Sequence, residues 1–281
     1  MTSAAARWPA VVVPVFNAPA ETAGCLASLA ATLPAGAGVL VIDDASTDPR
    51  VAGLLQGWQQ RRPDWGFEFR PRNRGFVHSA NLGFAAAADD VVLLNSDTQV
   101  TPGWLQGLAR CLRSDPAIAT ATPWTNNGEI ASLPGFCRAN PLPPDPAAVA
   151  AVIARSDPPL YPDLPTAVGF CMAVSRRAID ALGPFDEAAF GVGYGEENDF
   201  SIRAAAAGMR NVLCDDVYVA HLGNRSFGPL GLEPDEASMQ RLLARHPDYL
   251  RQVQAFIRQD PLRERREALL SALERAGVPL A

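Results

Sequence analysis

The hydrophobic positions of this chain form short apolar runs that alternate with segments of helical periodicity. Apolar runs without polar alternation predict buried strands, and apolar residues at three- and four-residue spacings predict amphipathic helices. The predicted strands are residues 10–16, 39–42, 66–70, 91–94, 118–122, 166–175, 211–214 and 217–220. The predicted helices are residues 21–33, 51–61, 75–88, 102–114, 147–155 and 176–182. This alternation predicts an α/β fold with a doubly wound, mostly parallel sheet and helices on both faces.

The tail of the chain has a different pattern. Beyond Pro234 it is helical and highly charged, with breaks at Pro247 and Pro261. We therefore expect an α/β domain over residues 9–230 and a helical C-terminal extension over residues 231–281. The apolar stripes of the extension favour packing on the domain; the alternative is a contact surface for a membrane or for a second copy of the chain. Acids mixed with the arginines speak against a purely electrostatic membrane anchor.

Composition excludes several classes of protein. The 281 residues carry 30 acids against 24 Lys+Arg, a formal net charge of -6, and no basic block, so nucleic acid is not an expected partner. The five cysteines are scattered without CxxC spacing, which favours reduced thiols over a disulfide scaffold or a zinc site. We expect no signal peptide, and the sequence has no run of about 20 apolar residues of the kind that spans a membrane. We expect a cytoplasmic protein, whose membrane contact, if it has one, is peripheral to the inner membrane.

Acidic residues follow two of the predicted strands. Asp43-Asp44 ends one strand and Asn95-Ser96-Asp97 ends another, so both loops belong to one rim of the sheet, where ligands of such folds bind. Clustered carboxylates repel, and a hard cation such as Mg²⁺ or Mn²⁺ relieves that repulsion. Asp97 suits such a cation, and His221, after another apolar strand, suits a second ligand position. The alternatives are helix capping by the acids and a structural, hydrogen-bonded role for His221.

A second acidic stretch lies at residues 191–203. Glycines occupy positions 191, 193 and 195, so Gly193 and Tyr194 lie in a glycine-rich segment. Glu196, Glu197 and Asp199 then occupy the first turn of a predicted helix. Helix starts favour negative charge, so capping alone explains part of the pattern.

Taken in order, seven segments resemble one family. They are VVVPVFN (11–17), VIDDASTD (41–48), NRGFVHSANLG (73–83), LLNSDT (93–98), GPFDE (183–187), GYGEENDFSIR (193–203) and HLGNRS (221–226). Over residues 9–227 the chain resembles the family 2 glycosyltransferases of the GT-A fold, among them the bacterial rhamnosyltransferase-like and polysaccharide-synthesising members.

The resemblance implies a reaction and roles for individual residues. It implies an inverting, metal-dependent transfer of a sugar from a nucleoside-diphosphate sugar to a hydroxyl of a glycan or glycolipid, with Mn²⁺ or Mg²⁺ as cofactor. Glu197 matches the catalytic base, and Asp97 and His221 match metal ligands. The implied donor-binding residues are Pro14, Phe16, Asn17, Asp43, Asp44, Arg74, Asn81, Asn95 and Ser96. The implied acceptor or loop residues are Gly193, Tyr194, Glu196 and Asp199.

Three positions depart from the family's pattern. Asn95 replaces the first acid of its DxD element, Ala80 replaces an arginine that many relatives carry, and Glu197 is one methylene longer than the usual aspartate. These departures leave a degenerate, non-catalytic binding or scaffold module as an alternative, which the retained Asp97 and the acids at 196–199 oppose. A sugar-phosphate nucleotidyltransferase is the second alternative; it would need glycines and a cation after the first strand, where residues 17–19 offer neither.

Overall fold

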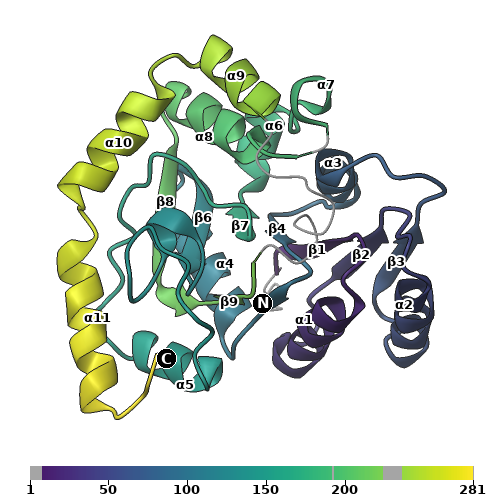
Figure 1. Cartoon of the computed structure of the whole chain (residues 1–281), viewed down its shortest axis with the longest axis horizontal. Coiled ribbons are helices and arrows are strands. Elements are labelled where there is room, and N and C mark those ends of the chain that lie inside the picture. Colours follow the sequence, from purple (N-terminus) through teal and green to yellow (C-terminus); the bar gives the residue numbers. More distant parts are fainter. Residues whose placement is uncertain (1–7, 192, 224–235, 281) are drawn as a thin grey trace, which may run out of the picture.

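The computed structural model describes residues 8–191, 193–223 and 236–280. Its centre is a seven-stranded sheet of order β3-β2-β1-β4-β7-β6-β8, and β5 and β9 form a separate two-stranded sheet (Figure 1). The strands are β1 (Ala10–Val15), β2 (Val39–Asp43), β3 (Gly66–Phe69), β4 (Val91–Leu94), β5 (Thr98–Gln99), β6 (Ile118–Trp124), β7 (Cys171–Val174), β8 (Arg210–Tyr218) and β9 (Ala220–His221).

Helices cover the sheet and continue into the tail. They are α1 (Pro19–Thr32), α2 (Pro49–Arg61), α3 (Phe76–Ala86), α4 (Trp104–Ser114), α5 (Pro146–Ile153), α6 (Arg176–Leu182), α7 (Glu187–Phe190), α8 (Glu196–Ala206), α9 (Glu236–Arg245), α10 (Tyr249–Gln259) and α11 (Arg263–Arg275), with a 3₁₀ turn, η1, at Glu129–Ala131.

The direction of the strands places their ends at a common rim. In the seven-stranded sheet, β7 is antiparallel to its neighbours β4 and β6, and every other pairing is parallel. The carboxyl ends of β1, β2, β4, β6 and β8 therefore face the same way. The segment that enters β7, Gly169-Phe170, lies at that rim too, because β7 runs in the opposite direction.

Two cores fill the two faces of the sheet. Val11, Val13 and Val15 of β1 belong to a core shared with α1, α2 and α4. Val12 belongs to the core on the other face, shared with α3, α6, α7 and α8. A strand that is buried on both faces is a continuous apolar run, which explains the unbroken pattern at 10–16. Gly83 lets α3 approach β1 closely, because a Cβ there would lie 2.5 Å from Val12 Cγ2.

The three C-terminal helices pack on the α/β unit (Figure 1). Leu242 of α9 is fully buried in the core that contains α8. Leu269 and Leu273 of α11 lie in a third core with α5 and β8. An ion pair at 2.8 Å joins Arg265 of α11 to the fully buried Asp215 of β8, so the tail is held by charge as well as by apolar contact.

The α/β class and the mostly parallel sheet predicted from the sequence are confirmed. The runs 211–214 and 217–220 differ from the prediction: residues 211–214 and 217–218 lie in the single strand β8, and Ala220 begins β9. Asp215 and Asp216 remain inside β8 because each has a cationic partner, Arg265 for the first and Arg110 for the second.

The strand predicted at 166–175 is shorter than expected. Only Cys171–Val174 pairs in the sheet, because the N–H groups of Ala167 and Val168 donate to the side-chain oxygens of Ser201 and Thr122. The domain boundary expected at 230/231 lies outside the described residues. Within 8–191, 193–223 and 236–280, no helix has the length and apolar character needed to cross a membrane.

Candidate functional site

The rim formed by the carboxyl ends of the strands collects most of the chemically interesting residues. Asp43 ends β2 and pairs with Val15 of β1 in the parallel register. Asn95-Ser96-Asp97 follows β4, on the other side of β1. The two acidic loops expected to share a rim therefore lie on either side of β1.

Asp44 connects the loop after β2 with the loop before α3. The residue is only 4% exposed, and its carboxylate accepts the N–H of Arg74 at 3.0 Å and the N–H of Gly75 at 2.7 Å. Its neighbour Asp43 accepts the N–H of Ser46 at 3.0 Å. Both acids therefore shape the loops around them, and Asp44 fixes the backbone just before α3.

Asn17 joins the ends of β1 and β2. It has a left-handed backbone, with φ of 58°, and its Oδ1 accepts the N–H groups of Thr47 and Asp48 at 2.9 Å each. Pro14, within β1, and Phe16, just after it, are partly buried. These residues and Asp44 lie at or near the carboxyl ends of the neighbouring strands β1 and β2, where a nucleoside is expected.

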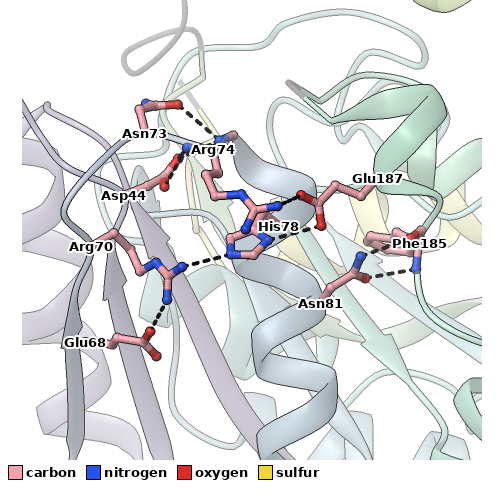
Figure 2. A network of polar contacts seen from close by, with 10 residues as sticks. Asp44, Glu68, Arg70, Asn73, Arg74, His78, Asn81, Phe185 and Glu187 are labelled. Carbon is pink, nitrogen blue, oxygen red and sulfur yellow. Dashed lines mark hydrogen bonds and ion pairs between the residues drawn. The ribbon is translucent and has the colours of Figure 1, made fainter.

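A chain of charged and polar contacts runs beside this place (Figure 2). Arg74 donates to Glu187 of α7 at 2.6 Å, and His78 of α3 contacts the other oxygen of Glu187 at 3.1 Å. Arg70 lies 3.1 Å from the second ring nitrogen of His78 and donates to Glu68. Because arginine can only donate, His78 Nε2 must accept, and Nδ1–H then donates to Glu187.

Asn81, one turn further along α3, has a structural contact. Its amide donates to the carbonyl of Phe185 and accepts the N–H of the same residue, both at 2.9 Å (Figure 2). This paired bonding holds the 183–187 segment against α3.

Asp97 and His221 are brought together by the small sheet. Thr98 of β5 pairs with His221 of β9, and Asp97 Oδ1 lies 3.4 Å from His221 Nε2. Asp97 is 5% exposed and Ser96 is 4% exposed. Asn95 supports the turn through its backbone, whose N–H donates to the carbonyl of Phe170 at 2.9 Å. Burial opposes protonation of His221, but the contact with Asp97 raises its pKa above the ordinary value.

The donor set at Asp97 and His221 fits a divalent cation that is shared with a substrate. Within 8–191, 193–223 and 236–280, no group of three or more His, Cys, Asp or Glu could hold a metal. Mg²⁺-type ions, however, are held by one or two carboxylates together with substrate phosphates and water. An Nε2 lone pair that faces a carboxylate oxygen across 3.4 Å is a repulsive arrangement unless a cation or a proton lies between them.

Glu196 and Glu197 form an unusual carboxylate pair at the start of α8. Each has a buried oxygen, Oε2, without a hydrogen-bond partner. Burial first, and then the charge of Glu197, raises the pKa of Glu196 well above its usual range. Burial likewise raises the pKa of Glu197 to about 7. Glu197 lies beside Gly169, since a Cβ on that glycine would be 3.9 Å from the carboxyl carbon.

The loop before α8 depends on its glycines. Gly193 and Gly195 have φ of 122° and 107°, and Tyr194 between them has φ of 68°. A Cβ on Gly193 would lie 3.6 Å from Phe76 Cβ, so the loop passes the start of α3.

Asp199 has cationic and histidine partners on α8 and in the tail. It accepts from Arg203 and contacts His246 of the tail, both at 2.8 Å. The structure thus gives Asp199 a role in holding the C-terminal helices to α8.

Four residues that the sequence did not single out lie around these groups. Phe170 stacks on the His221 ring with centroids 5.2 Å apart, and the carbonyl of Asn127 contacts His221 Nδ1. After burial, the charge of Glu129 contributes to the raised pKa of Glu197, and Tyr249 of α10 has a raised pKa from burial and from the charge of Glu197. The signal for two of them was Asn126-Asn127-Gly128-Glu129, polar residues directly after an apolar strand.

Comparison of the sequence with protein families gives one match. The model described as glycosyl transferase family 2 matches residues 10–183. A search among curated proteins gives no match.

Solved structures with a similar fold include a mannosyltransferase. The mannosyltransferase PcManGT from Pyrobaculum calidifontis, in complex with GDP-Man and Mn²⁺, has a TM-score of 0.61 and 18% identity, covering 97% of this chain and 76% of that one. GalNAc-T7 with UDP, GalNAc and Mn²⁺ has a TM-score of 0.63 and 16% identity; the match covers 98% of this chain but only 59% of that one. TarS 1-349 of S. aureus has a TM-score of 0.57 and 19% identity, covering 94% and 78%. At these identities the likeness shows the fold, which is GT-A.

Proposed function

This chain belongs to glycosyl transferase family 2, and from that premise we propose that it moves a sugar from a nucleoside-diphosphate sugar to a hydroxyl of a glycan or glycolipid, with inversion at the anomeric carbon and with Mn²⁺ or Mg²⁺ as cofactor. The observation that supports the proposal is that two pairs of side chains with different chemistry, one suited to a cation and one to a proton, lie at the same rim of the sheet. The two adjacent residues Gly169-Phe170 lie between the pair Asp97–His221 and the pair Glu196–Glu197. Phe170 stacks on His221, and a Cβ added to Gly169 would lie 3.9 Å from the carboxyl carbon of Glu197.

The donor occupies the rim around β1 in this proposal. Pro14, Phe16, Asn17 and the acids Asp43 and Asp44 surround the nucleoside, and Asn95 and Ser96 lie toward the ribose and phosphates. Arg74 faces the diphosphate as its cation. The Arg74–Glu187 pair is exposed on both sides, 39% and 35%, so exchanging Glu187 for phosphate costs little, because exposed pairs contribute about 0–1 kcal/mol. Asn81 holds the segment that carries Glu187.

Asp97 and His221 are the residues proposed to hold the cation. When bound there, Mn²⁺ or Mg²⁺ would act as a Lewis acid on the leaving nucleoside diphosphate. The protein supplies one anionic oxygen and one imidazole nitrogen, and their burial excludes water from one side of the site.

Glu197 is the proposed base. Direct displacement needs a carboxylate that takes the proton of the acceptor hydroxyl, and a base is most effective when its pKa is close to the working pH. Glu197, with a pKa of about 7, meets that requirement. Burial, and then the charge of Glu197, raise the pKa of Glu196 well above its usual range, which favours a protonated Glu196 beside the ionised base.

The acceptor approaches from the glycine loop in this proposal. Gly193 and Tyr194 lie between α7 and the two glutamates, and positive φ at both residues sets the path of the chain there. Asp199 contributes indirectly, by fixing the tail against α8.

Calorimetric titration tests the donor site. UDP, GDP, dTDP and CMP would each be titrated with Mn²⁺ and with chelator. We expect one nucleotide to bind with Mn²⁺ and to lose at least tenfold in affinity without it. Asp97→Asn should bind that nucleotide with no Mn²⁺ dependence. If the folded protein bound none of the four, the binding or scaffold module would become the better account.

A further inference from the structure

His221 is held from several sides by one loop. The loop, residues 125–128, follows β6 and is named here the β6 loop. Its Asn126 is 3% exposed; the side-chain Oδ1 accepts the N–H of His221 and the Nδ2 donates to the carbonyl of His221, both at 2.9 Å. Nδ2 also donates to the carbonyl of Asn140 at 3.1 Å, so the opposite orientation of the amide would face oxygen with oxygen.

The ring of His221 is fixed as firmly as its backbone. Its Nδ1 lies 2.5 Å from the carbonyl oxygen of Asn127, whereas its Nε2 lies 3.4 Å from Asp97 Oδ1. A carbonyl only accepts, so the shorter contact requires a proton on Nδ1. Placing the single proton of a neutral ring on Nε2 would instead leave two acceptors facing each other at 2.5 Å. The distances therefore select the Nδ1–H tautomer, which leaves the Nε2 lone pair directed at Asp97.

Two glycines and an aromatic ring close the arrangement. Phe170 stacks on the imidazole with an interplanar angle of 22°. A Cβ on Gly128 would collide with Thr125 and lie 3.1 Å from Phe170 Cε1, and a Cβ on Gly223 would collide with the Asn127 amide. Glycine at these two positions therefore avoids displacing the Thr125 and Asn127 side chains of the β6 loop.

We propose that the β6 loop is a positioning device for the cation site: Asn126 and the Asn127 carbonyl hold His221 as the Nδ1–H tautomer, so that Nε2 is presented with Asp97 to a divalent cation. Asn126 is the positioning residue. The inference rests on the proposed function for the presence of the cation, but the choice of tautomer holds in the metal-free protein. Histidines that bind metals are commonly oriented by a hydrogen bond from their other ring nitrogen to a backbone carbonyl. Loss of such a hydrogen bond typically lowers metal affinity by about 10–100-fold.

Nitrogen NMR of labelled histidine tests the tautomer directly. The chain has only three histidines, His78, His221 and His246, so each ring can be assigned, His221 by its loss in a His221→Gln variant. At a pH at which the rings are neutral, we expect His221 to carry its proton on Nδ1. A proton on Nε2 would overturn the proposal without bearing on donor binding.

Mn²⁺ added with the nucleotide that binds best should broaden the Nε2 signal of His221 far more than the signals of His78 and His246. If the nucleotide bound with Mn²⁺ but His221 remained sharp, the cation would lie elsewhere and the positioning proposal would fail while the proposed function stood. If no nucleotide bound at all, the proposed function and the cation part of this proposal would both fail.

The matched variants are Asn126→Ala and Asn211→Ala. Asn211 is equally buried, 3% exposed, and bonds Thr120 and Ser201 instead of the β6 loop. We expect Asn126→Ala to weaken Mn²⁺ binding in the nucleotide complex 10–100-fold and to leave the metal-free affinity for nucleotide unchanged. Asn211→Ala should lower the unfolding temperature without that selective loss. Equal Mn²⁺ affinity in folded Asn126→Ala and wild type would refute the positioning role.

Discussion

Replacing Glu197 by glutamine should stabilise the protein at high pH while it abolishes transfer. Burial raises the pKa of Glu197 from 4.5 to about 7. The folded state therefore favours the protonated carboxyl more than the unfolded chain does. At pH 5 the proton is largely present in the folded state and the cost of burial is small. As the pH rises through 7, the folded state must ionise a buried carboxyl, and stability is lost.

The size of the change in the free energy of unfolding follows from the raised pKa of Glu197. A difference of about 2.5 pKa units corresponds to about 3 kcal/mol at pH 8, and to less than about 1 kcal/mol at pH 5. Glutamine has nearly the same shape and never ionises, so Glu197→Gln should gain that free energy of unfolding at pH 8. Loss of a general base lowers the rate by about 10²–10⁴-fold. Wild-type kcat/KM should accordingly rise with pH and level off above pH 7.

Urea denaturation at pH 5 and pH 8, with a transfer assay on the same samples, measures both effects. Glu187→Gln is the control of opposite sign. Hydrogen bonding to His78 and the charges around it lower the pKa of Glu187, so its contribution is present above pH 4.5 and is lost as the pH falls. That variant should lose stability at pH 8, by under about 1 kcal/mol for so exposed a pair. A Glu197→Gln variant with equal stability changes at both pH values, or with normal transfer, would refute the reasoning.

Three further variants test other parts of the structure. Asp97→Asn should lower nucleotide affinity at least tenfold with Mn²⁺ and hardly at all with chelator, as calorimetry would record; an equal loss in both conditions would argue against a cation ligand. Gly195→Ala should cost about 1–3 kcal/mol in urea denaturation, since Gly195 has φ of 107° and a Cβ would lie 2.9 Å from Phe190 Cε1; unchanged stability would mean that the loop relaxes freely. Asp260→Asn should cost about 2–4 kcal/mol at pH 7, because it leaves Arg266 without the carboxylate that it contacts through two bonds of 3.0 and 2.6 Å; a neutral result would show that this end of α11 is not held by the pair.

The rim could be predicted from the sequence because its signals are local. A buried strand is indicated by an apolar run, and the segments Asp43-Asp44 and Asn95-Ser96-Asp97 each come directly after such a run. Parallel direction then brings both loops to one side of the sheet. The start of α8 was also visible, since three acids follow Gly195 within one helical turn.

The supporting contacts could not be predicted, because they join segments far apart in the chain. Nothing near Asn126 indicates that its amide bonds a histidine 95 residues later, and the prolines of 123–165 concealed an ordered loop. Asp44 was expected to face a nucleoside, yet its carboxylate also holds the N–H groups of Arg74 and Gly75. Long-range pairing of this kind depends on strand order, and the antiparallel β7 that sets it was not apparent from the apolar pattern.

The most direct test of the account is release of nucleoside diphosphate from a panel of nucleotide sugars. Wild type, Asp97→Asn and Glu197→Gln would be compared with Mn²⁺ and with chelator, in the presence of mixed glycan acceptors. The account predicts release from one nucleotide sugar by the wild type with Mn²⁺, at least a hundredfold less with chelator or with either variant, and retained nucleotide binding in Glu197→Gln. Release that persists in chelator, or at the wild-type rate in Glu197→Gln, would contradict it.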